Sequence, residues 1–117
     1  MYPTNNAETN KFILEDCKAN FLIVDDEKVL KAIYSSWDQL PCLKKIIKWG
    51  EPIVQSEYSS VVLNWEDLMK VGKEDTDDGP VLDRQKNMAI NQCCILIYTS
   101  GTTGNPKGNR CQLIFYY

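Results

Sequence analysis

The sequence predicts an α/β fold, and three stretches of it support this class. Phe21-Leu-Ile-Val24 and Lys44 to Trp49 are short apolar segments of strand length, and a helical pattern lies between them. A strand-helix-strand unit of this kind pairs its strands in parallel with a right-handed crossover. A third apolar run, Cys93 to Tyr98, is typical of a central parallel strand. The 117 residues, 44% of them hydrophobic and 25% charged, suffice for one globular domain.

The first two elements are predicted from Ala7 to Val24. Ile13, Leu14 and Cys17 recur at spacings of three and four residues, and a preceding Thr-Asn-Asn stretch is suited to an N-cap. These features predict a helix from Ala7 to Asn20. The next four residues, 21–24, are all apolar, which predicts a strand covered on both faces.

A second helix is predicted from Val29 to Trp37, because its apolar side chains fall on one helical face. Three acidic residues at 25–27 place negative charge at the positive end of this helix. Pro41 closes the region, and the pair Ile46-Ile47 between lysines predicts the second strand within 44–49.

Residues 50–87 carry weaker signals. A short strand is predicted at 61–63, and Asn64 is suited to cap a short helix that Gly72 would end. From Lys73 to Asn87 the chain is polar, acidic and interrupted by Gly79-Pro80, which predicts a surface connection. A metal site built from its carboxylates is the alternative to a solvated loop.

Composition excludes several classes of function. A net charge of −3 and a pI near 4.9 disfavour a nucleic-acid partner. The sequence has no histidine, which excludes Ser-His and Cys-His nucleophilic sites in this chain. The five cysteines lack C-x-x-C spacing, and we expect reduced thiols that pack. No stretch approaches the roughly 20 apolar residues of a membrane span, and no signal-peptide pattern opens the chain, so we expect a cytoplasmic location.

The chemistry concentrates after the third apolar run, in Thr99-Ser-Gly-Thr-Thr-Gly-Asn-Pro-Lys-Gly108. Its glycines permit close approaches that a Cβ would forbid, so main-chain N–H groups can turn toward one anion. Hydroxyl donors and one cation add to them, and such a loop at the carboxyl end of a strand matches polyphosphate oxygens. The candidate binding residues are Thr99, Ser100, Gly101, Thr102, Thr103, Gly104 and Lys107.

Two other interpretations of this loop can be compared with the anion site. A Ser/Thr/Gly-rich surface turn without a ligand is what composition alone would favour. A Walker A loop is excluded, because Pro106 stands where G-x-x-x-x-G-K counted from Gly101 requires its second glycine.

The string Tyr98-Thr-Ser-Gly-Thr-Thr-Gly-Asn-Pro-Lys-Gly108 resembles the phosphate-binding signature of the AMP-forming adenylating superfamily. Ten of its eleven positions match the usual consensus, and Asn105 stands where the family varies. Several upstream stretches are similar to long-chain fatty acid-CoA ligases of the bubblegum type. They are Tyr2 to Glu8, Cys17 to Asp25, Leu40 to Ile47 and Asn91 to Tyr98.

The resemblance implies an incomplete portion of the family's large N-terminal domain, a partial, doubly wound, mostly parallel sheet with flanking helices. Residues 1–108 would form part of the AMP-binding domain and end in the phosphate loop 98–108. Residues 109–117 form a divergent tail, because the family usually continues with a Ser/Thr-His pair. We interpret the break as a truncation or an alternative exon, with sequence divergence as the alternative.

The resemblance also implies a two-step reaction. A fatty carboxylate attacks the α-phosphate of Mg-ATP, and coenzyme A then displaces AMP from the acyl-adenylate. The seven candidate residues would hold the β- and γ-phosphates, and no residue of this chain is expected to be catalytic. ATP, Mg²⁺ and CoA are thus the implied cofactors and substrates, with peripheral membrane association possible by family.

Two hypotheses follow from the sequence. In the first, the chain is a piece of a fatty acid-CoA ligase that carries the phosphate loop but is not active alone. In the second, it is a non-catalytic truncated isoform that binds polyphosphate weakly or associates with a full-length synthetase.

Overall fold

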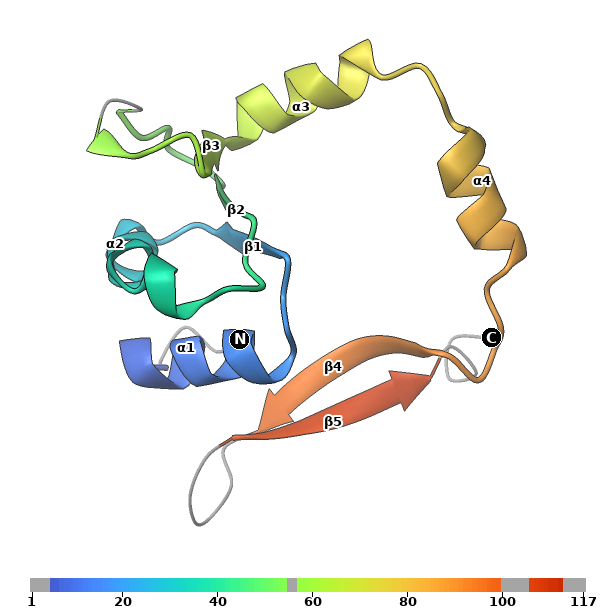
Figure 1. The fold of residues 1–117 in the computed structure, drawn as a ribbon, viewed down its shortest axis with the longest axis horizontal. Coiled ribbons are helices and arrows are strands. Elements are labelled where there is room, and N and C mark those ends of the chain that lie inside the picture. The colour runs from blue at the N-terminus through green and yellow to red at the C-terminus, as the bar shows by residue number, and fades with distance from the viewer. Residues whose placement is uncertain (1–4, 55–56, 100–105, 113–117) are drawn as a thin grey trace. The chain divides into compact units, whose positions relative to one another are not determined.

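The computed structural model describes residues 5–54, 57–99 and 106–112 (Figure 1). The chain divides into two compact units, residues 2–74 and residues 75–117.

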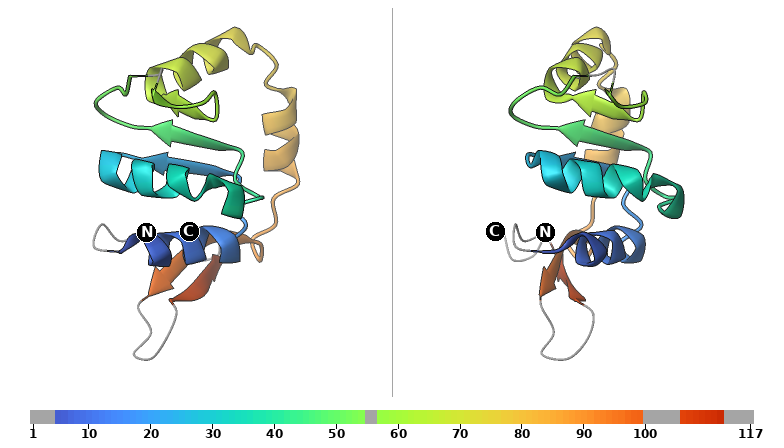
Figure 2. Two further views of the ribbon diagram at one scale, coloured as in Figure 1. Left: turned by 60° about the vertical axis from the view of Figure 1, so that its left-hand side comes forward. Right: turned by 90° about the vertical axis from the view of Figure 1, so that its left-hand side faces the viewer.

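The first unit has the α/β architecture that the sequence predicts. Three strands form a parallel sheet in the order β1-β2-β3, and helix α2 lies along one face of it (Figure 2). Its elements in chain order are α1 (Ala7–Asp16), β1 (Phe21–Val24), α2 (Glu27–Ser35), the 3-10 helix η1 (Trp37–Gln39), β2 (Lys45–Lys48), β3 (Val62–Asn64) and α3 (Trp65–Glu74).

Side-chain caps set where the first two helices begin. The Thr9 N–H donates to Asn6 Oδ1 at 2.8 Å, and α1 starts at the next residue after Asn6. Asp26 Oδ1 accepts from the N–H groups of Lys28 and Val29 at the start of α2, at 2.6 and 3.3 Å. Such caps satisfy N–H groups that have no partner within the helix. Helix α1 is shorter than predicted, because it ends at Asp16 rather than continuing to Asn20.

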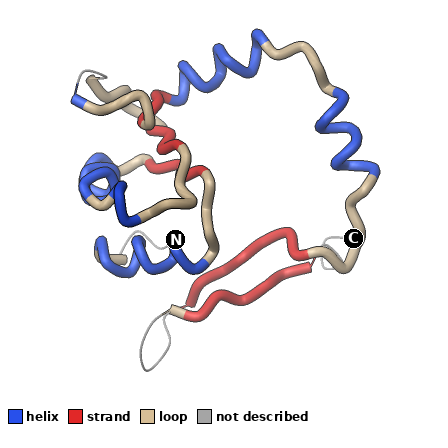
Figure 3. Tube along the Cα trace, in the orientation of Figure 1, coloured by secondary structure: helices blue, strands red, loops and turns tan. Residues whose placement is uncertain are grey.

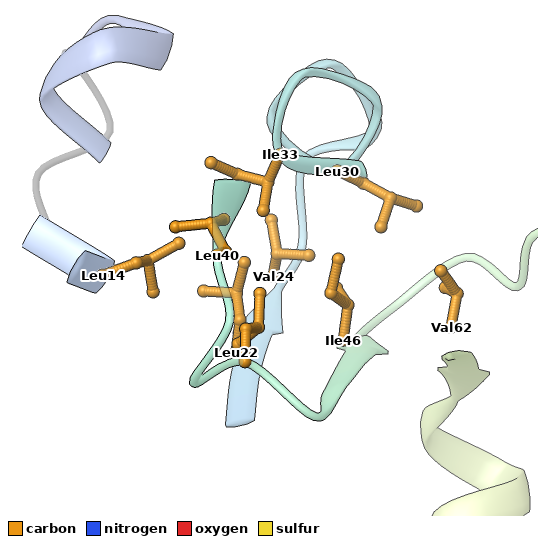
Figure 4. Close-up of a cluster of buried hydrophobic side chains, with 9 residues drawn as sticks. Leu14, Leu22, Val24, Leu30, Ile33, Leu40, Ile46 and Val62 are labelled. Atoms are coloured by element: carbon orange, nitrogen blue, oxygen red, sulfur yellow. The ribbon is translucent and has the colours of Figure 1, made fainter. Parts of the chain in front are cut away.

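The hydrophobic core lies between helices α1 and α2 and one face of the parallel sheet (Figure 4). Leu30 and Ile33 of α2 face Leu22 and Val24 of β1, and Ile46 of β2 lies beside them. Close packing of these apolar side chains is the main stabilising contribution in this unit. The complete buried cluster is Leu14, Leu22, Val24, Leu30, Ile33, Leu40, Leu43, Ile46 and Val62.

Strand β1 is covered on one face only, so the prediction of burial on both faces is wrong. Leu22 and Val24 are buried, whereas Phe21 and Ile23 are 61% and 57% exposed. Ile47 pairs with Ile23 across the sheet and is buried, so the other face is covered at β2 but not at β1. An unbroken apolar run shows that both faces can be buried, but not that both have a partner.

Helix α3 begins at Trp65, directly after Asn64 as predicted, but Gly72 does not end it. Asn64 ends β3, and its side chain holds the backbone of Ile53, accepting from its N–H at 2.9 Å and donating to its carbonyl at 3.4 Å. Gly72 lies inside α3, which continues to Glu74. An exposed glycine costs a helix about 1 kcal/mol relative to alanine, which is not enough to end it.

The predicted surface connection 73–87 contains a helix, α4 (Gly79–Lys86). Pro80 lies in its first turn, where a missing N–H removes no helical hydrogen bond. Arg84 and Lys86 lie in its last turn, at the negative end of the helix dipole. The Gly-Pro pair therefore begins a helix rather than marking a turn, although the segment is exposed as predicted.

The second unit contains a hairpin of β4 (Cys93–Thr99) and β5 (Lys107–Gln112) (Figure 3). The two strands pair antiparallel, and Ile95, Leu96 and Ile97 are exposed. The prediction that 93–98 is a strand is confirmed, but its assignment as a buried parallel strand is wrong in this structure. A parallel partner requires a crossover of a dozen or more residues, whereas only residues 100–106 separate β4 from β5, so these two strands pair antiparallel.

Candidate functional site

The hairpin brings the two ends of the predicted anion loop together. Thr99 is the last residue of β4 and Lys107 is the first residue of β5, and the two form a registered cross-strand pair. Ser100, Gly101, Thr102, Thr103 and Gly104 lie outside the described residues. The structure therefore places two of the seven predicted binding residues, and it places them opposite each other.

Thr99 and Lys107 supply complementary donors for an anion. Directly opposed residues of an antiparallel pair project on the same face, with Cβ atoms roughly 4.5–5.5 Å apart. Both residues are exposed, and within the described ranges no carboxylate forms an ion pair with Lys107. A hydroxyl and an ammonium group at the mouth of one loop can donate together to phosphate oxygens.

Gly108 lies close to an aromatic ring, one residue further from the loop than Lys107. Gly108 pairs with Tyr98, and a Cβ added to the glycine would lie 3.0 Å from Cζ of the tyrosine ring. The sequence predicted only that the glycines of the loop allow a close approach to an anion. It did not indicate that the neighbour is an aromatic ring, because that follows from the register of the hairpin.

The other end of the hairpin carries cysteines. Cys94 lies where the register shifts between Cys93 and Ile95, and its Sγ is 3.4 Å from the carbonyl oxygen of Cys111. All five cysteines are free thiols, as predicted. The expectation that they pack is wrong for Cys42, Cys93 and Cys94, which are exposed. Across the described part of the chain, no group of three or more acidic, cysteine or histidine side chains could hold a metal ion.

Sequence reasoning missed a polar cavity in the first unit. It has a volume of about 370 Å³ and lies where β1 and β2 end, at the edge where α/β sheets bind ligands. Lys48 lines it and is only 5% exposed, and its Nζ donates to the Trp49 carbonyl oxygen at 2.6 Å. The cavity's acidic lining residues are Asp25, Glu27, Glu51 and Glu57.

One carboxylate of this cavity, that of Glu27, has a lowered pKa. Glu27 Oε1 lies 2.6 Å from Lys31 Nζ, one helical turn along α2. The hydrogen bond from Lys31, together with its positive charge, lowers the pKa of Glu27 below its usual value. Only the position of strand ends at 24 and 48 could have indicated this cavity from sequence, which predicted Asp25 and Glu27 solely as negative charge at the start of a helix.

None of the helices in the described part of the chain has the length and apolar character that a membrane span requires.

Comparison with known proteins identifies the family. A family model described as AMP-binding enzyme matches residues 1–110. Long-chain-fatty-acid–CoA ligase ACSBG1 of Rattus norvegicus is 39% identical over 110 residues, which cover 92% of this chain and 15% of that protein. The ACSBG1 protein of Homo sapiens is 40% identical over 110 residues, covering 92% of this chain and 14% of its own length.

A solved structure agrees with both the sequence match and the fold. The anthranilate CoA ligase AuaEII, in complex with anthranoyl-AMP, superimposes with a TM-score of 0.71 and 27% sequence identity. The match covers 97% of this chain and 19% of that one. The chain thus spans about a sixth of the length of the ligases it resembles, and it belongs to the AMP-binding enzyme family.

Proposed function

We propose that this chain carries the phosphate-binding loop of an ATP-dependent long-chain fatty acid-CoA ligase. The proposal is supported by its family and by its 39–40% identity to proteins named long-chain-fatty-acid–CoA ligases. In this proposal residues 1–108 are part of the AMP-binding domain and end in the loop 98–108, and residues 109–117 diverge from it.

The observation that carries the proposal is the cross-strand pair of Thr99 and Lys107. A glycine- and hydroxyl-rich segment whose two ends are held together by antiparallel pairing can surround one anion. The charged end, Lys107, then faces the hydroxyl end, Thr99, across the mouth of that segment. We assign the β- and γ-phosphates of ATP to Thr99, Ser100, Gly101, Thr102, Thr103, Gly104 and Lys107.

This assignment gives the loop a defined chemical task. When a fatty carboxylate oxygen bonds to the α-phosphorus, the bond from that phosphorus to the bridging oxygen of the β-phosphate breaks. Negative charge then grows on the departing pyrophosphate, and hydroxyl, N–H and ammonium donors aimed at its oxygens stabilise it. They also orient ATP for the attack of a weak nucleophile.

The remaining reaction components are assigned by family. Mg²⁺ would accompany ATP as part of the substrate, and CoA would accept the acyl group from the acyl-adenylate with release of AMP. The described residues provide no cluster suited to a metal ion.

Binding is tested by titrating the 117-residue chain with sodium tripolyphosphate. We expect Lys107→Ala to weaken binding at least about tenfold, because a charge-assisted contact contributes roughly 1.5–3 kcal/mol. Lys44→Ala removes the same charge from an exposed lysine of the first unit and serves as the matched control. Equal loss in both variants would show attraction by net charge rather than by the loop.

Turnover is tested by exchange of radioactive pyrophosphate into ATP in the presence of palmitate. We expect no exchange by the 117 residues alone, because they correspond to about 15% of a relative such as rat ACSBG1. Exchange above the rate without palmitate would show that these residues contain a complete adenylation site.

Uncovered apolar side chains favour a second role, in which the chain packs against a longer member of its family. Phe21 and Ile23 on β1 are exposed, as are Ile95 and Ile97 on the hairpin. Size-exclusion chromatography of the chain mixed with a full-length bubblegum-type ligase tests this role. A shared elution peak that Ile23→Asp abolishes supports it, and separate peaks exclude it.

A further inference from the structure

Tyr98 and Gly108 form a cross-strand pair, which is the neighbour of the Thr99–Lys107 pair at the two ends of the loop. A Cβ on Gly108 would lie 3.0 Å from Cζ, 3.1 Å from Cε1 and 3.2 Å from the hydroxyl oxygen of Tyr98. Carbon atoms pack best at about 3.5–4.0 Å, so a side chain at position 108 would require the far end of the Tyr98 side chain to shift by a few tenths of an ångström. We call Tyr98 and Gly108 the hairpin neck.

We propose that Tyr98 is a positioning residue for phosphate binding, because its ring covers Gly108 and fixes the spacing of the next pair, Thr99 and Lys107. The inference rests on the proposed function, since it gives the neck a role in holding phosphate. An aromatic ring over a cross-strand glycine restores the side-chain packing that the glycine lacks. Without that packing, two exposed strands have little to hold them in register.

Packing of the Tyr98 ring on Gly108 and strand propensity predict opposite effects for a substitution at position 108. Valine is among the best strand formers and glycine among the worst, so Gly108→Val should stabilise the hairpin if the glycine were merely tolerated. If the Tyr98 ring packs on Gly108, the valine methyl groups displace the ring or the strand. The spacing of Thr99 and Lys107 then changes, and phosphate binding weakens.

A double-mutant cycle on the 117-residue chain separates these cases. The dissociation constant for sodium tripolyphosphate is measured for the unsubstituted chain, Gly108→Val, Tyr98→Ala and the double variant. We expect Gly108→Val alone to weaken binding about tenfold, in line with the cost of overpacking. In the Tyr98→Ala background the same change should cost less than about twofold, because the ring it would displace is absent.

Tyr98→Phe is the conservative comparison. It keeps the ring over Gly108 and should recover most of the affinity that Tyr98→Ala loses, which we expect to be about fivefold. Unchanged affinity in Gly108→Val overturns the proposal. Equal losses from Gly108→Val with and without the Tyr98→Ala substitution also overturn it, since position 108 would then act independently of the ring.

An NMR measurement tests whether the Tyr98 ring packs on Gly108, even if the proposed function fails. In the unsubstituted chain, the ring current of Tyr98 should shift the Gly108 Hα resonances away from ordinary glycine values, and Tyr98→Phe should keep that shift. Tyr98→Ala should remove it and move the amide resonances of Thr99 and Lys107. If tripolyphosphate does not bind at all, the proposed function fails. Gly108 Hα resonances at ordinary glycine values would instead show that the neck does not form.

Discussion

Residues 2–74 and the β4–β5 hairpin both contain paired strands, but different forces hold those strands in place. In the first unit, Leu22, Val24 and Ile46 are buried beneath α2, and the sheet is parallel. In the hairpin, pairing is antiparallel and local, and Ile95 to Ile97 remain exposed. The core of the first unit therefore supplies stability, while the candidate binding residues lie on the less buried of these two regions.

The largest effect is expected from a substitution that removes packing in the core of the first unit. Ile46 is 0% exposed, and Ile46→Ala should lower the free energy of unfolding by about 3 kcal/mol in urea denaturation. Ile23→Ala is the matched control on the neighbouring strand, where exposure should limit the loss to below about 1 kcal/mol. Similar losses for both variants would contradict the assignment of buried and open faces.

A smaller effect is expected at the start of α2. Asp26→Ala removes the carboxylate that accepts from the Lys28 and Val29 N–H groups, and should cost about 1 kcal/mol of unfolding free energy. Asp25→Ala removes the adjacent exposed carboxylate, which caps no helix, and should change the same quantity by less than about 0.5 kcal/mol. A reversed order would show that Asp25 is the cap.

The smallest effect is a pH dependence at the exposed pair of Glu27 and Lys31. Lys31 lowers the pKa of Glu27 in the folded chain, so this carboxylate stabilises the fold above its ordinary pKa of 4.5. That contribution is lost as pH falls through the lowered value. A carbon-13 NMR titration should give a Glu27 midpoint below 4.5, and Lys31→Gln should raise it. An unchanged midpoint in the variant would show that Lys31 is not the cause.

Much of the first unit could be predicted from sequence because its signals are local. The strand 21–24 and the helix after Asp26 follow from a short apolar run and a capping residue. Which face of β1 would be covered could not be predicted, because the apolar pattern of Phe21 and Ile23 does not say what packs on them. Helix α4 was missed because Gly79-Pro80 is equally suited to a turn and to a first helical turn.

The candidate site, too, could be predicted only in part from the sequence. The types of residue in the loop predicted a phosphate site, and the structure places Thr99 and Lys107 opposite each other. The packing of the Tyr98 ring on Gly108 depends on the register between β4 and β5. Register is set by pairing between strands, and no pattern within either strand alone specifies it.

The most direct test of the phosphate-binding assignment is an NMR titration of the 117-residue chain with ATP, following all backbone amides. We expect the amide resonances of Thr99, Lys107 and Gly108 to shift with one common dissociation constant, while those of residues 21–24 stay in place. Shifts centred on the carboxyl ends of β1 and β2, with the hairpin resonances unchanged, would contradict the account.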